Sequence, residues 1–464
     1  MGILAAFMVP HPPLIVPEVG RGEEKKIQKT VDAYEAVGRW IGQLEPETIV
    51  LLSPHQVMYA DYFHISPGKG AEGDLGRFGA GQVKIRCSFD QAFVDELCRL
   101  AEARGLPAGK LGERDKALDH GTMVPLYFVE KYWKSYGLVR IGLSGLPLTE
   151  HYRLGQCIQE AAEDLDRRTV VIASGDLSHR LKEDGPYGFR KEGPAYDERI
   201  MEVMGEGTFG ELFDFTEDFC ERAGECGHRA FTILAGALDR TEIVTERLSY
   251  EGPFGVGYGI CAYTAWGRDP GRDLKRQYEK RIREEIIKQR EQEDAYVRLA
   301  RRTIEGYVRT GELPEAESLK SLPTEMTGRR AGVFVSLKKD GRLRGCIGTI
   351  QAVQPSIAEE IVHNAISAAT HDPRFSPVGE DELEMLSVSV DVLGDAEPVT
   401  SLEELDVKRY GVIVTKGGRR GLLLPDLDGV DTVEEQIKIA REKAGIAPDE
   451  EVRLERFEVI RHHG

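Results

Sequence analysis

Three runs of apolar and β-branched residues, each typical of a buried strand, lead directly into a short polar segment that contains a histidine. Ile3–Val9 leads to His11, Thr48–Leu52 leads to His55, and Thr169–Ser174 leads to His179. In an open α/β sheet, ligands bind in the crevice beyond the carboxyl ends of the strands. Histidines delivered there by three separate strands are expected to converge on one site, either a metal centre or a general-base centre.

The N-terminal part of the chain, from residue 1 to about 268, alternates buried strands with amphipathic helices. The expected helices are Lys25–Gln43, Gln91–Arg104 and Thr149–Arg167, and the further strands are Gly137–Leu143, Tyr258–Trp266 as a closing strand and Gln82–Phe89 as an antiparallel edge. This alternation predicts an α/β domain with a mixed, mostly parallel sheet flanked by helices.

After this domain the composition changes twice. Residues 269–294 are dense in charges of both signs, which predicts a charged helical linker, with a partner-binding helix as the alternative. Residues 295–464 then mix hairpins with helices, which predicts a separate α+β domain. Its expected helices are Ala295–Arg309, Pro355–Thr370 and Thr432–Ala444, and its expected strands are Gly332–Leu337, Arg342–Ile350, Leu383–Leu393 and Glu451–Val459. A length of 464 residues fits two or more domains.

Charge and cysteine usage exclude several classes of protein. A net charge of −18 argues against a general nucleic-acid binder, because phosphate contacts need clustered lysine and arginine. The seven cysteines are scattered and never form a Cys-x-x-Cys pair, as expected in the reducing cytoplasm. The apolar N-terminus lacks a basic leader and no apolar run is long enough to span a bilayer, so we expect a cytoplasmic protein without membrane contact.

Two histidines and one carboxylate form the facial triad of non-haem Fe(II) oxygenases, and neutral imidazole is the commonest metal ligand. His11 and His55 would supply the two nitrogens, and the third ligand would come from residues 223–228, where Glu225, Cys226 and His228 are the candidates. Each residue alone has a structural explanation; the helix macrodipole, for example, accounts for Glu225 at a helix start. Four histidines at the ends or edges of core elements, His120 included, together favour a shared site.

These segments resemble the class III (LigB-type) extradiol ring-cleavage dioxygenases, including their Memo-like branch. The matching pieces are Pro10-His11-Pro12, Ser53-Pro54-His55, Asp119-His120-Gly121-Thr122 and Gly175-Asp176-Leu177-Ser178-His179. The resemblance implies that His11, His55 and Glu225 hold Fe(II), which would bind O2 and a catechol-like aromatic substrate. It further implies that His179 is the general base for the phenolic proton and that His120 positions the substrate or oxygen.

One residue departs from the iron interpretation. Cys226 follows Glu225, and Memo-like relatives resemble this segment with cysteine at the ligand position. A thiolate would shift the preference toward Cu or Zn and would weaken the case for dioxygenase chemistry. We favour Glu225 as the third ligand and keep Cys226 as the alternative.

A second polar cluster is expected in the C-terminal domain. Arg344 and Cys346 share one face of a strand, so the positive charge could make the thiol more reactive. The alternative is a structural cysteine in a tightly packed strand. Arg374 belongs to a polar run that follows a helix and could complete this cluster. The alternative is that this run is only a turn that ends the helix.

These runs resemble the AMMECR family, through Leu-Arg-Gly-Cys-Ile-Gly at Leu343–Gly348 and Asp-Pro-Arg-Phe at Asp372–Phe375. The two resemblances together match the fused protein of the AmmeMemoRadiSam system, which implies a radical-SAM protein as partner. The chain has no Cys-x-x-x-Cys-x-x-Cys motif of its own. The alternative function is therefore metal or redox handling with that partner, on a peptide or small molecule and without ring cleavage. The sequence is also compatible with a homo-oligomer.

Overall fold

The computed structural model describes residues 2–112, 117–314, 319, 321–427 and 429–463, and forms two compact units, Met1–Tyr278 and Glu279–Gly464. The boundary lies within helix α9 (Leu274–Gln292), inside the predicted linker. Within the described residues, none of the helices combines the length and apolarity that crossing a bilayer requires.

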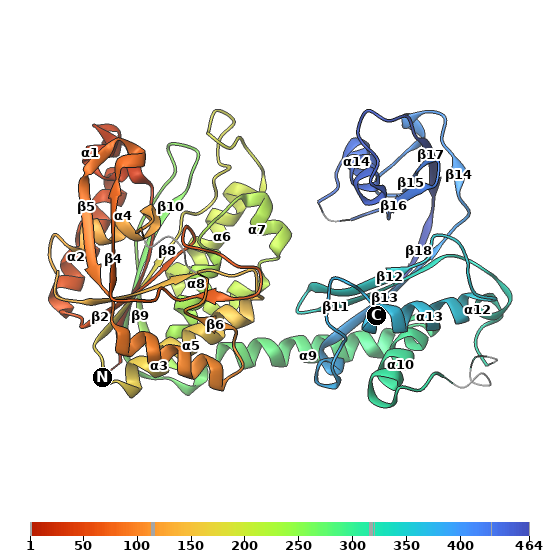
Figure 1. The fold of residues 1–464 in the computed structure, drawn as a ribbon, viewed down its shortest axis with the longest axis horizontal. Coiled ribbons are helices and arrows are strands. Elements are labelled where there is room, and N and C mark those ends of the chain that lie inside the picture. The colour runs from red at the N-terminus through yellow and green to blue at the C-terminus, as the bar shows by residue number, and fades with distance from the viewer. Residues whose placement is uncertain (1, 113–116, 315–318, 320, 428, 464) are drawn as a thin grey trace. The chain divides into compact units, whose positions relative to one another are not determined.

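The N-terminal unit is built on a six-stranded sheet with the order β7-β2-β8-β1-β10-β9 (Figure 1). The strands are β1 (Ile3–Val9), β2 (Thr48–Ser53), β7 (Gly137–Gly142), β8 (Thr169–Ser174), β9 (Thr241–Glu251) and β10 (Tyr258–Arg268). Strands β7, β2, β8 and β1 are parallel, whereas β10 and β9 run antiparallel along one edge. The predicted mixed, mostly parallel sheet is confirmed.

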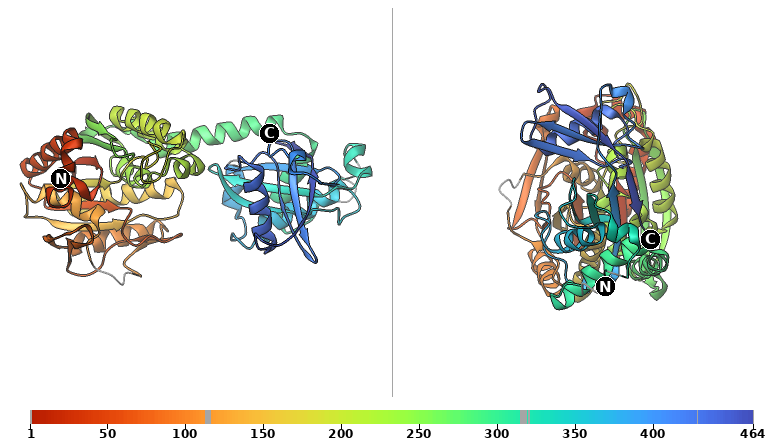
Figure 2. Two further views of the ribbon diagram at one scale, coloured as in Figure 1. Left: turned by 90° about the horizontal axis from the view of Figure 1, so that it is seen from above. Right: turned by 90° about the vertical axis from the view of Figure 1, so that its right-hand side faces the viewer.

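Helices cover both faces of this sheet (Figure 2). Helices α2 (Gln28–Leu44) and α4 (His120–Val129) pack on one face, and α5 (Leu148–Asp164) and α8 (His228–Ala237) pack together on the other, where α8 contacts β8 and β1. Helices α3 (Gln91–Ala103) and α6 (Glu192–Glu206) lie outside these, α3 against α5 and α6 against β9. A β-carbon on Gly236 would come within 2.0 Å of the Tyr152 carbonyl oxygen, so only glycine allows α5 and α8 to approach this closely.

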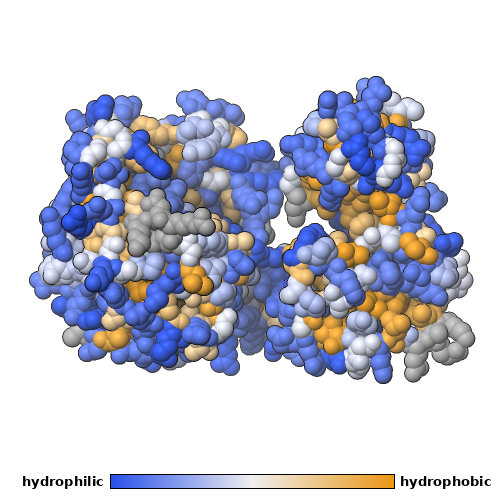
Figure 3. Space-filling view, viewed as in Figure 1, coloured by the Kyte–Doolittle hydropathy of each residue, from blue (hydrophilic) through white to orange (hydrophobic). Residues whose placement is uncertain are grey.

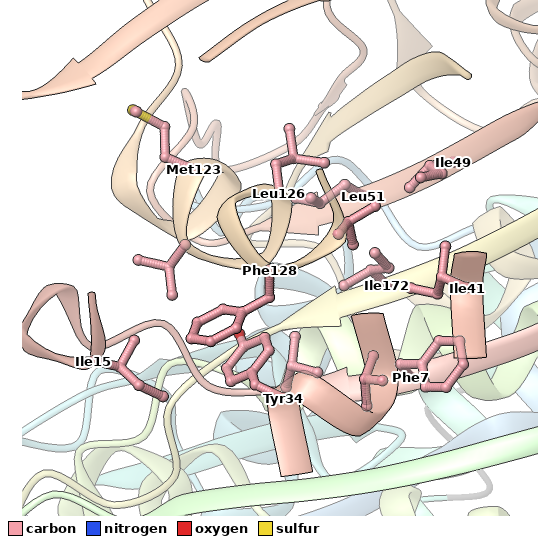
Figure 4. Packing of buried hydrophobic residues seen from close by; sticks show 14 of the residues in the cluster. Phe7, Ile15, Tyr34, Ile41, Ile49, Leu51, Met123, Leu126, Phe128 and Ile172 are labelled. Carbon is pink, nitrogen blue, oxygen red and sulfur yellow. The ribbon is translucent and has the colours of Figure 1, made fainter. Parts of the chain in front are cut away.

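The core between α2, α4 and the sheet anchors the end of β1. Tyr34 of α2 stacks on Phe128 of α4 with ring centroids 4.4 Å apart, and Phe7 of β1 belongs to the same buried cluster (Figure 4). Burying each such side chain stabilises the fold by roughly 2–3 kcal/mol. The Tyr34 hydroxyl also donates to the carbonyl of Pro10, so the core holds the residue that precedes His11.

This topology places the three histidine segments together. Strand β8 lies between β2 and β1, and all three are parallel, so their carboxyl ends open on the same edge. The segments around His11, His55 and His179 leave the sheet side by side, as the sequence predicted.

The C-terminal unit contains two four-stranded antiparallel sheets, β12-β11-β13-β18 and β14-β17-β15-β16. Their strands are β11 (Val333–Lys339), β12 (Arg342–Gly348), β13 (Leu386–Leu393), β14 (Glu397–Pro398), β15 (Gly411–Lys416), β16 (Arg419–Leu423), β17 (Arg453–Phe457) and β18 (Val459–His462). Helices α10 (Ala295–Thr310) and α13 (Ile357–Thr370) pack on the first sheet, and α14 (Val433–Ala444) on the second. Each sheet with its helices forms one lobe of this unit, and hydrophobic residues gather between the two lobes (Figure 3).

Two strand predictions need correction, and one strand was missed. The predicted final strand 451–459 is wrong as one element, because β17 and β18 belong to different sheets, and the buried Phe457 lies where the chain changes sheet. The edge predicted at 82–89 is β5 (Ala80–Ser88), which pairs antiparallel with β4 (Gly70–Leu75) in a separate hairpin. Strand β9 was not predicted, since most of its residues alternate between partial and full exposure without a run of buried positions.

Candidate metal centre

His11 and His55 point their imidazoles at one another beyond the ends of β1 and β2. Their Nε2 atoms lie 2.9 Å apart, and Cys226 Sγ lies 3.6 Å from His11 Nε2. The three ligand atoms all fall within 4.8 Å of one another. The structure therefore brings the two predicted histidines together with a thiol that comes from the loop before α8.

The hydrogen bonds of His11 leave one ring nitrogen available as a ligand. The Ser174 hydroxyl donates to the carbonyl of Gly121 at 2.6 Å, so it accepts from His11 Nδ1 at 3.0 Å. With its proton on Nδ1, His11 presents the Nε2 lone pair to His55 and Cys226. A partner that holds the other ring nitrogen is typical of histidines that bind metals.

Burial keeps both imidazoles neutral. It lowers the pKa of His11 well below its ordinary value, and the neighbouring His55 lowers it further. The pKa of His55 is also lowered, mainly by burial, although its ring retains solvent access. Neutral imidazole is the form that binds metal ions, so this pair fits a metal without losing protons.

The Cys226 thiol is held in place by the β8 loop. Its sulfur accepts from the backbone N–H of Asp176 at 3.2 Å. Burial raises the pKa of Cys226 well above its ordinary value, and the carboxylates of Asp176 and Glu225 raise it further. A metal cation at this position would instead lower the pKa of the Cys226 thiol, because coordination deprotonates a thiol. The donor set of two imidazoles and one thiol therefore fits a metal ion.

The structure places Glu225 in a different role from the predicted one. Its carboxylate accepts from the backbone N–H of His228 at 2.6 Å, at the start of α8, and burial raises its pKa to about 7. His228 is buried, and its ring nitrogens contact Tyr196 and the carbonyl of Leu212. The group of ligand atoms within 4.8 Å of one another contains Cys226 beside the two histidines and not Glu225, so the geometry favours the alternative ligand Cys226 over Glu225.

His120 and His179 flank the cluster. The ring of His120 lies 4.0 Å from that of His55, centroid to centroid, and burial, reinforced by His55 and His11, lowers its pKa to about 4. His179 donates from Nδ1 to the carbonyl of Gly224, which leaves Nε2 as a base 4.0 Å from an Asp176 carboxylate oxygen. Both predicted residues therefore lie beside the His11–His55 pair.

A cavity of about 1440 Å³ opens onto this centre. Its lining includes His55 and His120 on one side and both strands of the β4–β5 hairpin on the other. Phe78 closes against the His120 ring, with centroids 5.3 Å apart. The cavity provides room for a substrate directly beside two of the four histidines.

Three residues hold the histidines in place: Ser53 and Asp119 belong to the matching motifs but were given no role, and Arg140 was not predicted from the sequence. Asp119 accepts from Arg140 at 3.0 Å and from the Ser53 hydroxyl at 2.6 Å, and that hydroxyl accepts from the backbone of His55. Asp119 also caps α4, which begins at His120. Arg140 is almost fully buried in β7, and a charged residue inside an apolar strand is the signal that would have revealed it.

The predicted C-terminal cluster is brought together only in part. Arg344 does not turn to Cys346, because its guanidinium binds the Glu382 carboxylate at 2.8 and 3.0 Å. The Cys346 sulfur instead accepts from the Ser336 hydroxyl at 3.2 Å. Arg374 pairs with Asp372 and donates to the Cys346 carbonyl at 3.0 Å.

Comparison with known proteins covers both units. A family model described as the catalytic LigB subunit of aromatic ring-opening dioxygenase matches residues 5–261, and the AMMECR1 model matches residues 297–462. Protein CA_C1420 of Clostridium acetobutylicum is 44% identical over 469 residues, which cover 100% of this chain and 99% of the relative. A protein of Thermotoga maritima is 56% identical over 172 residues, which cover 37% of this chain and 98% of the relative. The crystal structure of uncharacterized protein PH0010 from Pyrococcus horikoshii is 36% identical, with a TM-score of 0.34, and the match covers 36% of this chain and 88% of that one.

Proposed function

Since this chain belongs to the LigB family and carries an AMMECR1 domain after its LigB domain, we propose that its N-terminal unit is a metal-dependent redox protein. A single ion is held by His11, His55 and Cys226. The observation that carries this proposal is the convergence of these three ligand atoms within 4.8 Å at the carboxyl edge of the sheet.

The ligand set favours a soft or borderline ion. A thiolate with two imidazoles suits Cu(I) or Zn, and Fe(II) is the competing ion. When bound, the metal would supply an open coordination position and, for copper or iron, a redox centre. The protein itself contributes neutral imidazoles, a fixed His11 orientation through Ser174, and a cavity beside His120.

The remaining histidines would act on a bound substrate. His179 is set up to accept a proton at Nε2, since its Nδ1 is held by the Gly224 carbonyl. His120 faces the cavity between His55 and Phe78, where it can orient a small aromatic molecule or a peptide side chain.

Metal analysis of protein purified without air tests the proposal. We expect one ion per chain, at least a tenfold loss of affinity in His11→Ala, His55→Ala and Cys226→Ser, and no loss in Glu225→Gln. His363→Ala is the matched control, because that histidine is exposed in the C-terminal unit. Unchanged binding in His11→Ala and His55→Ala would reject the centre, and loss only in Glu225→Gln would restore the carboxylate as ligand.

Ring opening of a catechol with Fe(II) and O2 is the second candidate. It is supported by the LigB family and by the Nε2 base of His179 beside the cluster. Oxygen uptake by the Fe(II)-loaded chain with a panel of catechols tests it, and His179→Gln should slow uptake at least a hundredfold. No uptake with any catechol, while one metal ion stays bound, would leave metal or redox handling as the function.

We also propose a radical-SAM protein as partner. The fusion of an AMMECR1 domain to the LigB domain is the observation that supports this. Mixing the chain with a radical-SAM protein of the same organism and measuring the mass of the complex tests it. Separate elution of the two proteins, with and without metal, would contradict it.

A further inference from the structure

A second cavity, of about 630 Å³, lies at the edge of the main sheet opposite to the metal centre. Ile3 at the start of β1, Trp266 near the end of β10 and Gln156 on α5 contribute to its walls. Strand β1 ends at Val9, just before His11, so this cavity and the metal centre lie at opposite ends of one strand. The volume is within the range of sites for small molecules.

The floor of this cavity is a hydrogen-bonded network around Asp239. The Asp239 carboxylate is almost fully buried and accepts from the Tyr152 hydroxyl at 2.6 Å and from Gln156 Nε2 at 2.9 Å. The Asp239 carbonyl accepts from Gln159 Nε2 at 2.8 Å and from the Thr241 hydroxyl at 3.1 Å. That hydroxyl therefore accepts in its 2.8 Å bond with Gln159 Nε2. These acceptors fix the orientation of both glutamine amides.

The two glutamines keep their amide oxygens available. Because each Nε2 is committed to the network around Asp239, each Oε1 lies on the other side of its amide, and neither accepts a hydrogen bond from a described residue. Gln156 and Gln159 are three residues apart on α5, so their side chains are neighbours on the helix surface. Both line the cavity and are partly exposed. The wall thus fits a ligand that donates two hydrogen bonds.

Trp266 gives the cavity a flat aromatic wall. This residue is 71% exposed, whereas tryptophan is highly buried on average in folded proteins. An exposed indole beside polar groups is suited to stacking on a planar ring. The wall therefore favours a flat aromatic ligand over an aliphatic one.

The arginines of the cavity wall are already paired with carboxylates. The ion pairs are Arg104–Glu160, Arg268–Glu163 and Arg240–Asp273. Because these positive charges are compensated, the cavity favours an uncharged ligand over one that carries a phosphate.

We propose that this cavity binds an uncharged planar nitrogen heterocycle that carries a primary amino group, as an amino-substituted nucleobase or nucleoside does. The ring stacks on Trp266, and the two diverging N–H bonds of the amino group donate to Gln156 Oε1 and Gln159 Oε1. The site goes beyond the proposed metal centre, with which it shares no residue.

Matched pairs of nucleosides test the proposal on the full chain. Adenosine is compared with inosine, and cytidine with uridine, by isothermal titration calorimetry, since within each pair an oxo group replaces the ring amine. We expect the amino member of at least one pair to bind about tenfold more tightly than its counterpart, because only that member supplies both donors.

Two variants assign the binding to this cavity. Trp266→Ala should weaken the affinity about tenfold through the lost stacking, and its folding should be unaffected because the indole is exposed. Gln159→Met removes one acceptor and should reduce the preference for the amino member to about threefold or less.

The controls are Tyr132→Ala and Gln82→Met, which should leave the affinity unchanged. Tyr132 is an exposed aromatic residue that donates to Glu35 of α2, and Gln82 is exposed in β5; neither lines the cavity. Equal affinities within both pairs would overturn the proposal, as would an absence of binding or an affinity that Trp266→Ala leaves unchanged. Removal of metal with a chelator should not alter nucleoside affinity, so failure of this site and failure of the metal centre are distinguishable.

Discussion

At the scale of single residues, one hydroxyl determines which nitrogen of His11 is available. Ser174 ends strand β8, donates to Gly121 and so can only accept from His11 Nδ1. Without it, either ring nitrogen could carry the proton, and the Nε2 lone pair would no longer be aimed at His55. The ligand geometry therefore depends on a residue that would not itself touch the ion.

Ser174→Ala should weaken metal binding about tenfold while the fold is retained, because the ring loses its anchor but not its place after β1. Competition with a chelator of known affinity measures the change. Ser249→Ala is the control, since that buried serine lies in β9 and its hydroxyl has no hydrogen-bond partner among the described residues. Equal affinity in Ser174→Ala and the control would show that the hydroxyl has no part in the centre.

The two histidines were predictable, whereas the choice between Glu225 and Cys226 was not, for a physical reason. His11 and His55 follow strands whose apolar runs are plain in the sequence, so the parallel topology alone places them together. Cys226 depends on the path of a loop in which Gly224 has a φ of 68° and Gly227 packs on Gly175. Neither feature has a periodicity that distinguishes position 225 from position 226.

At the scale of elements, a buried ion pair connects three pieces of the N-terminal unit. Arg140 of β7 binds Asp119 at the start of α4, and Ser53 at the end of β2 donates to the same carboxylate. Burial raises the pKa of Asp119, but Arg140 and the hydrogen bonds more than offset this and lower it. The pair is therefore ionised and fixes His55 and His120 relative to each other.

Arg140→Met should lower the free energy of unfolding of the N-terminal unit by about 3 kcal/mol, because it leaves the Asp119 carboxylate buried without its cation. Urea unfolding followed by tryptophan fluorescence measures this. Arg86→Met, which removes an exposed pair with Glu72, should cost less than about 1 kcal/mol. Adding Asp119→Asn to Arg140→Met should recover part of this loss of unfolding free energy. A double variant that loses more unfolding free energy than the two single variants together would contradict the pairing.

Glu382 makes the free energy of unfolding of the C-terminal unit depend on pH in the acid range. Partial burial raises its pKa, but hydrogen bonds from Arg344, Gly379 and Lys339 prevail and lower it to about 2 from 4.5. A carboxyl with a depressed folded pKa stabilises above its unfolded pKa, and the contribution is lost as pH falls through the folded value. Glu382→Gln should therefore lose about 2 kcal/mol at pH 7 and match the unaltered unit near pH 2.

Far-UV circular dichroism during urea unfolding between pH 7 and pH 2 measures this difference. Glu384→Gln is the control, because Glu384 forms an exposed pair with Arg283 and should show little effect at any pH. A difference between Glu382→Gln and the unaltered chain that stays constant down to pH 2 would refute the assigned pKa.

Strands were predictable where they form a continuous buried run, and less so where two consecutive strands join different sheets. Strand β8 was predicted with its observed bounds because all six of its residues are buried. The segment 451–459 was predicted as one strand, although its apolar positions shift phase between Leu454 and Phe457; β17 pairs with β15 and β18 pairs with β13. Which sheet a strand joins depends on partners far away in the chain, and local periodicity carries no information about them.

At the scale of the whole molecule, each unit has its own hydrophobic core and α9 is fastened separately to both. Tyr278 stacks on Phe213 of the N-terminal unit, and Arg290 donates to the carbonyl of Leu383 in the C-terminal unit. Separate cores joined by one helix favour independent unfolding.

Metal should therefore stabilise only one of two unfolding transitions. All three tryptophans of the chain, Trp40, Trp133 and Trp266, lie in the N-terminal unit, so their fluorescence follows that unit alone, whereas circular dichroism follows both. An ion at about a hundred times its dissociation constant adds about 2.7 kcal/mol to the folded unit that binds it. For a unit of this size, that raises the fluorescence midpoint by roughly 5 °C and leaves the second transition seen by circular dichroism in place. In His55→Ala the same metal should move neither transition. A single transition that shifts as a whole with metal would show that the two units unfold together and that the C-terminal unit is coupled to the centre.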